Sequence, residues 1–570
     1  MTSDDDMPQT YNYTYDDFVN AHQAQLIAAD IPPGLWETLF AKLANETFDA
    51  GDYMTLFFEE DDDSGHPWRV MSSQAINADC SIFIVDHAWT FRMTEQRRLL
   101  LADSSLLKRM SDIVGLSHDL TEAERESSDE EIQGDIDGNE KKSIGRERKE
   151  SREALKKADH VDNVIDRLWK YIGTYSIRYK KEVDEEASTV WYVMDELGSR
   201  IGHSRTPNAR LVPLFFTPHG LSYSVLFFTQ SITEEVEIFR DCTECLVSLQ
   251  HPEWADILEF PWIERDFSHV PTARPFPNDA YFTGGRSCDQ LAPISLQESS
   301  SFSNHSPLRI YTDDENFVSH LSIPFELVDD WKNADIVWLH SHFYNYGDLA
   351  KDNSTALVNQ FPCESCLTTK DLLASIMCKG DSPPPQYFQM TFNLNTQLAQ
   401  FVSYFQRREK SGEENVWIVK PWNLARGLDM TVCNSLKQMI RLVETGPKIA
   451  CKYIERPVLF KREDTGKKVS YVYINFWIRF AINEFTLEEL DDVETHFTVF
   501  NYADPTKILQ MKCDEFVNGL EKSNVNIKWK ETRMKINEAL ASLFQHASTE
   551  DVPRGVASNR QSRAMYGVDV

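Results

Sequence analysis

The sequence predicts an α+β protein built from more than one domain. A chain of 570 residues, 41% of them apolar, has enough material for about two to four buried cores. In both halves, segments with helical spacing of apolar residues alternate with short runs of β-branched and aromatic residues. Two stretches break this pattern: a highly charged one at 117–159 and one rich in Pro, Ser and Gly at 266–307. We therefore predict a domain at 1–265, a linker at 266–307 and a second domain at 308–570.

The first 115 residues contain helix and strand signals in turn. The apolar spacing and the breakers around it predict helices at 15–29, 35–45 and 93–113, and strands at 53–58 and 81–91. These segments indicate a mixed α/β layer at the start of the first domain.

Residues 117–159 are nearly all charged or small. Such a segment has too few apolar groups to offset the entropy that ordering would remove. We therefore predict a disordered or loosely helical insertion within the first domain.

After the insertion, the pattern predicts a helix at 161–179 and strands at 188–194, 211–216 and 223–228. The polar residues between and after these strands follow the order found at the end of a SET domain, which the chain resembles at His203, Ser204, Pro207, Asn208, Glu234, Glu235 and Asp241.

Three positions depart from the SET pattern. Gly202 stands in place of the cofactor-contacting Asn, Arg205 in place of a Cys, and Cys242 in place of the catalytic Tyr. Because methyl transfer to lysine needs the Tyr phenol, the resemblance implies a SET-like scaffold that binds no S-adenosylmethionine. A SET-type protein lysine methyltransferase is the remote alternative.

The second domain begins with a β-α-β pattern. Strands are predicted at 308–311, 325–328 and 334–339, with a helix at 314–321, and together they indicate a small open α/β layer. Two more helices are predicted, at 368–378 with Thr368 as N-cap and at 395–406.

Residues 415–430, NVWIVKPWNLARGLDM, carry the clearest functional signal. The apolar run 416–419 predicts a strand that ends at Lys420, and the loop after Pro421 presents Arg426 and Gly427. Arg offers a planar fork, Lys a point charge, and Gly a backbone that a ligand can approach closely. The stretch therefore predicts a polyphosphate site; the alternative is an ordinary strand followed by a solvated turn.

The charge of the chain limits its partners. A net charge of −32 argues against direct nucleic-acid binding, which needs an excess of Lys and Arg. Residues 401–480 are the local exception, with 15 Lys or Arg and 8 Asp or Glu, a charge of +7. This segment suits one anionic ligand, such as a nucleotide or an acidic peptide, and the alternative is a basic solvated surface.

The sequence also predicts a cellular location. It has no apolar run of about 18 residues and starts with an acidic, polar segment, so neither a membrane span nor a secretory signal is expected. Its ten Cys are scattered, as in a protein with reduced thiols. We expect a cytoplasmic protein that does not contact a membrane. These observations do not exclude entry into the nucleus.

Five motifs of the second domain occur in the order typical of one family: NQFP…LTTKD at 359–371, WIVKPWNLARG at 417–427, KYIERPVLF at 452–460, HFTVFNY at 496–502 and RAMYGVDV at 563–570. With them the chain resembles the tubulin tyrosine ligase-like family. The resemblance implies an ATP-grasp fold whose members ligate an amino acid to a tubulin carboxylate through an acyl phosphate. It also implies tubulin or microtubules as partners, and ATP and Mg²⁺ as cofactors.

The family pattern assigns roles to individual residues. The resemblance implies that phosphates contact Lys420, Arg426 and Gly427, that adenine contacts Lys452, Tyr453 and Ile454, that Arg479 is catalytic and faces the transferring phosphate, and that Asp569 binds the metal. These roles agree with the chemistry, since phosphoryl transfer depends mostly on positioning and charge neutralisation.

Two parts of the family pattern are missing. The Glu and Asn that should complete the metal site after Asp569 would lie beyond Val570. The family's Lys-Phe-Asp-Ile-Arg strand is also missing, because the sequence continues after Lys468 with VSYVYIN and then FWIRF. We therefore expect a C-terminally incomplete ATP-grasp domain. The chain is predicted to be a degenerate ligase that binds tubulin and ATP without efficient catalysis. The alternative is an active ligase represented by an incomplete gene model or splice form.

Overall fold

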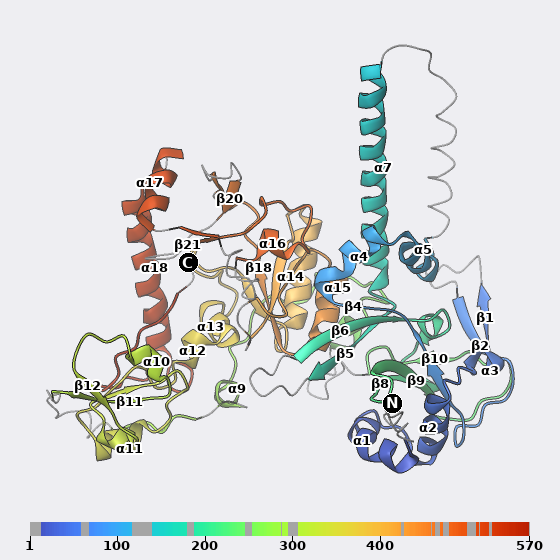
Figure 1. Ribbon diagram of the computed structural model, residues 1–570, viewed down its shortest axis with the longest axis horizontal. Coiled ribbons are helices and arrows are strands. Elements are labelled where there is room, and N and C mark those ends of the chain that lie inside the picture. Colours follow the sequence, from blue (N-terminus) through green and yellow to red (C-terminus); the bar gives the residue numbers. More distant parts are fainter. Residues whose placement is uncertain are drawn as a thin grey trace, which may run out of the picture. The chain divides into compact units, whose positions relative to one another are not determined.

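The computed structural model describes residues 13–58, 68–116, 139–178, 187–244, 254–284, 286, 288–293, 306–422, 424, 427–457, 459–461, 468–470, 478–498, 509–511, 513–523 and 527–568. The chain divides into two units (Figure 1). Unit 1 comprises Met1–Asp266 together with Ser435–Gly446, and unit 2 comprises Phe267–Asn434 and Pro447–Val570.

Unit 1 contains three antiparallel sheets and one short parallel pair. The sheets are β3-β9-β8 (Ile82–Val85, Leu221–Phe228, Ala209–Phe216), β4-β6-β5 (His87–Phe91, Ala187–Met194, Ile172–Arg178) and β1-β2 (Met54–Phe58, Trp68–Ser72), and the parallel pair is β7 (Gly202–His203) with β10 (Phe239–Arg240).

The N-terminal helices of unit 1, within residues 15–44, cover one face of the β3-β9-β8 sheet. The helices of unit 1 are α1 (Tyr15–Ala28), η1 (Pro33–Leu35), α2 (Trp36–Ala44), α3 (Ala50–Tyr53), η2 (Met93–Glu95), α4 (Gln96–Ala102), α5 (Ser104–Ile113), α7 (Asn139–Leu168), η4 (Gly198–Arg200), α8 (Ala255–Leu258), α15 (Leu436–Arg441) and η8 (Leu442–Thr445). Phe18 and Leu39 pack on Val225 in this layer, and Thr14 starts α1 with a capping box to Asp17.

Three predictions for unit 1 need correction. The helix predicted at 161–179 is wrong in its second half, because α7 ends at Leu168 and Ile172–Arg178 is strand β5, paired with β6. The strand predicted at 81–91 is divided into β3 and β4. The helix predicted at 93–113 is interrupted at Asp103, whose carboxylate accepts hydrogen bonds from the Ser105 and Leu106 amides and so starts a new helix, α5.

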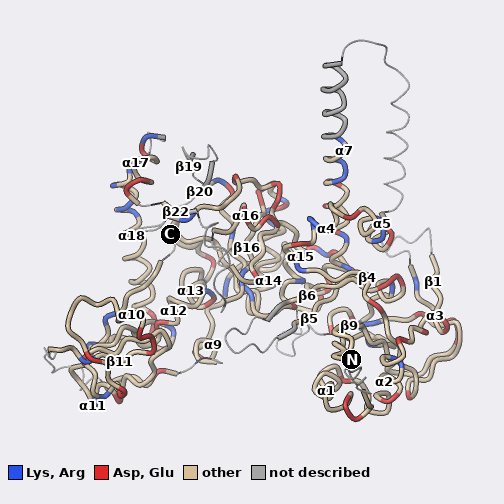
Figure 2. Tube along the Cα trace, viewed as in Figure 1, with Lys and Arg blue, Asp and Glu red and all other residues tan. Residues whose placement is uncertain are grey.

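The charged insertion is helical where the structure describes it. Helix α7 starts at Asn139, within the segment predicted to be disordered or loosely helical, so the helical alternative holds for 139–159. The rest of that segment, 117–138, lies outside the described residues. Figure 2 shows acidic and basic residues interspersed along the described parts of both units.

Among the helices of the described ranges, none has the length and apolar content needed to cross a membrane.

Unit 2 contains a parallel and an antiparallel four-stranded sheet. The parallel sheet is β12-β11-β13-β14 (Phe325–Leu327, Leu308–Thr312, Ile336–Trp338, Leu357–Val358), the antiparallel one is β15-β18-β16-β17 (Thr391–Asn393, Lys448–Lys452, Trp417–Pro421, Thr431–Cys433), and two hairpin-like pairs follow, β19-β20 (Leu459–Lys461, Lys468–Ser470) and β21-β22 (Ile478–Phe480, Leu509–Met511).

The helices of unit 2 are α9 (Asp279–Thr283), α10 (Glu315–Val318), η7 (Trp331–Asn333), α11 (Tyr346–Asp352), α12 (Ser365–Thr368), α13 (Lys370–Met377), α14 (Leu398–Lys410), α16 (Val493–His496), α17 (Cys513–Ser523) and α18 (Trp529–Thr549). Thr368 is not the N-cap that the sequence predicts: it ends α12, and Thr369 precedes α13 without a side-chain capping bond.

The described part of the predicted linker packs inside unit 2. Phe282 is buried against Cys366 and Leu372, and the backbone of Arg274 pairs with that of Gly380. The aromatic residue Phe282 therefore anchors this Pro- and Ser-rich segment to the core of unit 2. The overall composition of the segment, from which the linker was predicted, does not reveal such an anchoring residue.

Candidate nucleotide-binding site

Strand β16 positions the side chains of the predicted phosphate site. Trp417 and Val419 are fully buried, and the Trp417 ring lies 5.1 Å from that of Phe401 in α14. Because side chains alternate across a strand, Ile418 and Lys420 lie on the face opposite Trp417. Lys420 is half-buried at the end of this strand, as the sequence predicts.

An apolar patch lies on the same face as Lys420. Val416, Ile418 and Val432 form its centre, and Cys451 and Tyr453 pack against them. The Tyr453 hydroxyl hydrogen-bonds with Nδ1 of His496 at 2.8 Å, which holds the phenol ring beside the patch. An apolar, partly aromatic surface that ends at a lysine suits a planar base with an attached phosphate chain.

A second lysine lies close to Lys420. Lys370 is the first residue of α13, and its ammonium donates a hydrogen bond to the Leu424 carbonyl. Burial and the neighbouring charge of Lys420 both lower the pKa of the Lys370 ammonium. Within the described ranges the Lys420 side chain makes no hydrogen bond or ion pair. The two ammonium groups therefore repel each other, and an anion between them would relieve the repulsion.

Lys370 was not among the residues that the sequence assigned to the site. Its signal was nonetheless present in the LTTKD motif, which places a lysine at the start of a helix. Only the fold brings this helix to the end of β16.

In the loop after β16, the structure describes one of the two predicted phosphate-binding residues, Gly427. Gly427 has φ +75°, a left-handed conformation that favours glycine, and the space around it is open. Arg426 lies outside the described residues. Lys448, fully buried beside Pro421, forms an ion pair with Asp429, so its charge is already balanced within the protein.

The segment Lys452-Tyr453-Ile454 is divided among different environments. The Lys452 ammonium donates to the Val416 carbonyl at 3.0 Å, pairs with Glu455 and lies over the Trp417 ring, away from the Lys420 face. Burial lowers the pKa of Lys452, and Glu455 opposes this shift. Ile454 is 54% exposed, so only Tyr453 joins the apolar patch.

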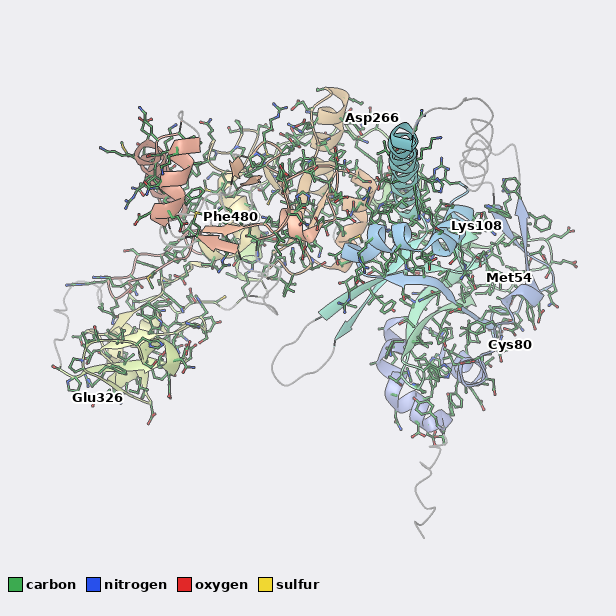
Figure 3. All side chains as sticks on the ribbon, turned by 45° about the horizontal axis from the view of Figure 1, so that its top comes forward. Met54, Cys80, Lys108, Asp266, Glu326 and Phe480 are labelled. Atoms are coloured by element: carbon green, nitrogen blue, oxygen red, sulfur yellow. The ribbon has the colours of Figure 1, made fainter. Side chains whose placement is uncertain are left out.

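The remaining predicted residues are not brought to Lys420 by the same sheet. Arg479 lies in β21, opposite Gln510, in a separate two-stranded sheet next to Phe480 (Figure 3). Asp569 lies outside the described residues. Within the part of the chain that the structure describes, no three His, Cys, Asp or Glu side chains are grouped so that they could hold a metal ion.

Strand β20 (Lys468–Ser470) pairs antiparallel with β19. The segments on either side of it, 462–467 and 471–477, lie outside the described residues. Because β20 does not carry the Lys-Phe-Asp-Ile-Arg motif, the absence of the family's strand stays a prediction.

In unit 1, the SET-like residue Asn208 links the segment after β7 to the start of β10. Strands β7 and β10 pair in parallel, and the Asn208 side chain donates to the Glu237 carbonyl at 2.7 Å and accepts from the Phe239 amide at 2.9 Å. A Cβ atom at Gly202 would lie 3.2 Å from the Phe239 ring, so this ring lies tightly against the position where SET enzymes carry Asn.

Comparisons with known proteins agree with both halves of the chain. The model of the tubulin–tyrosine ligase family matches residues 348–570, and that of the tubulin tyrosine ligase SET-like domain matches residues 70–136 and 149–265. Tubulin–tyrosine ligase-like protein 12 of Caenorhabditis elegans is 42% identical over 98% of this chain and 91% of its own length. The proteins of the same name from Caenorhabditis briggsae and Mus musculus are 42% and 33% identical, over 98% and 97% of this chain and 90% and 87% of their own lengths.

The chain belongs to the tubulin–tyrosine ligase family. The predicted α+β fold class and the SET-like character of the N-terminal half are thereby confirmed. The family generally depends on ATP and Mg²⁺. Among the described residues, Lys370, Lys420 and the apolar patch with Tyr453 are the ones that could hold a nucleotide.

Proposed function

We propose that this chain binds tubulin and a nucleotide, and that it modulates tubulin modification without efficient ligation. Membership of the tubulin–tyrosine ligase family and the names of the related proteins support tubulin as the partner. A cytoplasmic, microtubule-associated location belongs to the same proposal and can be checked by imaging a tagged chain.

One contrast within unit 2 carries the proposal. Lys370 and Lys420 lie together beside an apolar patch, so the features that hold a nucleotide are present. The Lys-Phe-Asp-Ile-Arg strand of the family pattern is missing from the sequence after Lys468, and with it the Asp carboxylate that this strand would add to the site. Loss of one electrostatic contact to a transition state typically costs about 3–4 kcal/mol, so binding would persist while transfer slows.

The experiment measures binding and transfer on the same preparation. Purified chain is sedimented with microtubules and incubated with tubulin, ATP, Mg²⁺ and labelled tyrosine, glutamate or glycine. We expect co-sedimentation and no incorporation of label.

Either of two results would refute the proposal. ATP-dependent incorporation that is lost in Lys420→Ala would identify an active ligase. Absence of tubulin binding by a folded chain would remove the partner. A thermal shift with S-adenosylmethionine would instead favour methyl transfer by unit 1.

A further inference from the structure

One edge of the parallel sheet in unit 2 is open. Strand β12 is the last strand on its side of this sheet and pairs only with β11. The Pro324 carbonyl and the Val328 amide form hydrogen bonds with β11, both of 3.0 Å. Because backbone groups alternate between the two sides of a strand, the amides and carbonyls of Phe325 and Leu327 face outward. Within the described part of the chain, these outward groups have no hydrogen-bond partner, so they can pair with another strand.

Apolar side chains are exposed along the same edge. Leu321, Ile323 and Leu327 are 40%, 47% and 44% exposed. In the register of the sheet Leu327 lies beside Ile310, which is only 1% exposed. Both faces of a parallel sheet are normally covered, and an exposed group of large apolar side chains marks a surface that another molecule covers.

The charge around this edge selects the partner. Residues 313–330 contain six Asp or Glu and no Lys or Arg. Glu326 and Asp329 are exposed and form no ion pair with any described residue, and Figure 3 shows Glu326 at the periphery of this part of unit 2. A second copy of the chain, paired through the same edge, would bring like charges together. A positively charged partner would meet complementary charge.

We propose that β12 docks an extended segment, rich in Lys and Arg, of a partner protein. The segment adds a strand through the outward backbone groups of Phe325 and Leu327. Because the side chains of Glu326 and Leu327 point to opposite faces, the added strand alternates basic residues with apolar ones. No residue of this edge belongs to the candidate nucleotide-binding site, so the docking function goes beyond the modulation of tubulin modification.

The test uses the full-length chain and a defined probe. A fluorescein-labelled short peptide that alternates Lys and Val is titrated with the protein at physiological ionic strength, and its anisotropy is measured. One control peptide has the same sequence with alternate backbone amides methylated, and a second alternates Lys and Ser. We expect saturable binding of the Lys-Val peptide and roughly tenfold weaker binding of each control, which lacks either the backbone donors or the apolar side chains.

Variants locate the binding on the protein. Glu326→Lys and Leu327→Ser should each weaken binding of the Lys-Val peptide by roughly tenfold, because they reverse a complementary charge and remove an apolar contact. The matched controls are Glu538→Lys and Met534→Ser at exposed positions of α18, which should leave affinity unchanged. Melting temperatures show which variants are folded, and the Glu326 variant decides if the Leu327 variant is not.

Three results would overturn the proposal. Absence of saturable binding would show that the acidic residues only protect the edge from pairing. Equal affinity for the methylated peptide, or for folded Glu326→Lys, would show that no strand is added at β12. Sedimentation velocity without peptide covers the remaining occupant: a dimer that Leu327→Pro abolishes would assign the edge to a second copy. Pro at this position removes only an outward amide, which an edge strand tolerates.

Discussion

The charge of Lys420 contributes to lowering the pKa of Lys370, although the two residues are fifty positions apart in sequence. Each is held by a different element, one by the start of α13 and the other by the end of β16. Like charges that the fold holds close together favour a bound anion. Because the two lysines belong to different elements, the contribution of each to anion binding can be tested by a separate substitution.

We expect Lys420→Ala and Lys370→Ala each to weaken ATP binding by about 1.5–3 kcal/mol, roughly ten- to a hundredfold, because each removes a charged hydrogen bond to phosphate. Isothermal titration calorimetry measures the change. Exposed Lys351 on α11 supplies the control, since Lys351→Ala should leave affinity unchanged. Unchanged affinity in both site variants would mean that β16 ends in an ordinary turn.

His87 provides a second test at this scale. Burial lowers its pKa from 6.5 to about 4, its ring stacks on Tyr192 at 3.9 Å, and Nε2 lies 3.0 Å from the Ser224 hydroxyl. Because the unfolded chain binds the proton more readily, the stability that neutral His87 provides is complete above pH 6.5 and is lost as the pH falls toward 4.

We therefore expect the urea midpoint of unit 1 to fall between pH 7 and pH 4 by an amount equivalent to about 3 kcal/mol from His87. His87→Gln should reduce this fall, while His320→Gln, at an exposed position of unit 2, should not. Pulse-labelling hydrogen exchange of peptides from β4 and β6 reports the unfolding of unit 1 specifically. Equal pH dependence in wild type and His87→Gln would contradict the assignment.

At the scale of single elements, the end of helix α7 is stabilised by a residue that lies far away in the sequence. Arg441 of α15 is 3% exposed and donates to the carbonyls of Trp169 and Ile172, both at 2.6 Å. It also pairs with Glu444 and lies over the Trp262 ring. These contacts satisfy carbonyls between the end of α7 and the start of β5, where the sequence predicts that the helix continues.

Arg441→Ala should destabilise unit 1 by about 3–5 kcal/mol, because it leaves Glu444 and two buried carbonyls without their partner. Faster hydrogen exchange at 165–175 would show that the end of α7 and the start of β5 loosen. Gln438→Ala on the same helix is the control and should have little effect. A loss of stability without faster exchange at 165–175 would show that Arg441 acts elsewhere.

At the scale of the whole molecule, unit 1 is made from two separate pieces of sequence. The segment Ser435–Gly446 belongs to it, and Met439, Ile440 and Leu442 of that segment are buried. Strands β17 and β18 of the candidate nucleotide sheet directly precede and follow this segment in the chain.

A fragment of residues 267–570 would therefore expose the apolar side of α15. We expect limited proteolysis to cleave this fragment within 435–446 at a rate at least several-fold higher than in the full chain. Cleavage at 346–352, in α11 of unit 2, serves as the control and should occur at equal rates. Equal protection of 435–446 in the fragment would show that unit 2 alone can hold the segment.

The sequence by itself determined the features that depend on local pattern and motif. Short runs of apolar, β-branched and aromatic residues predicted β6, β8, β9, β11 and β16, and breakers and helical spacing predicted α1 and α2, because these elements have clear local patterns and clear ends. The ordered motifs of the second half predicted the family, and Lys420 was placed at the end of its strand.

The tertiary structure alone decided what depends on distant partners. The apolar spacing of 161–179 suits a helix, but Arg441 and pairing with β6 end α7 at Leu168 and make 172–178 a strand. Lys370 meets Lys420 only because α13 packs at the end of β16. Periodicity reports one element at a time, whereas a site requires elements from different parts of the chain to meet.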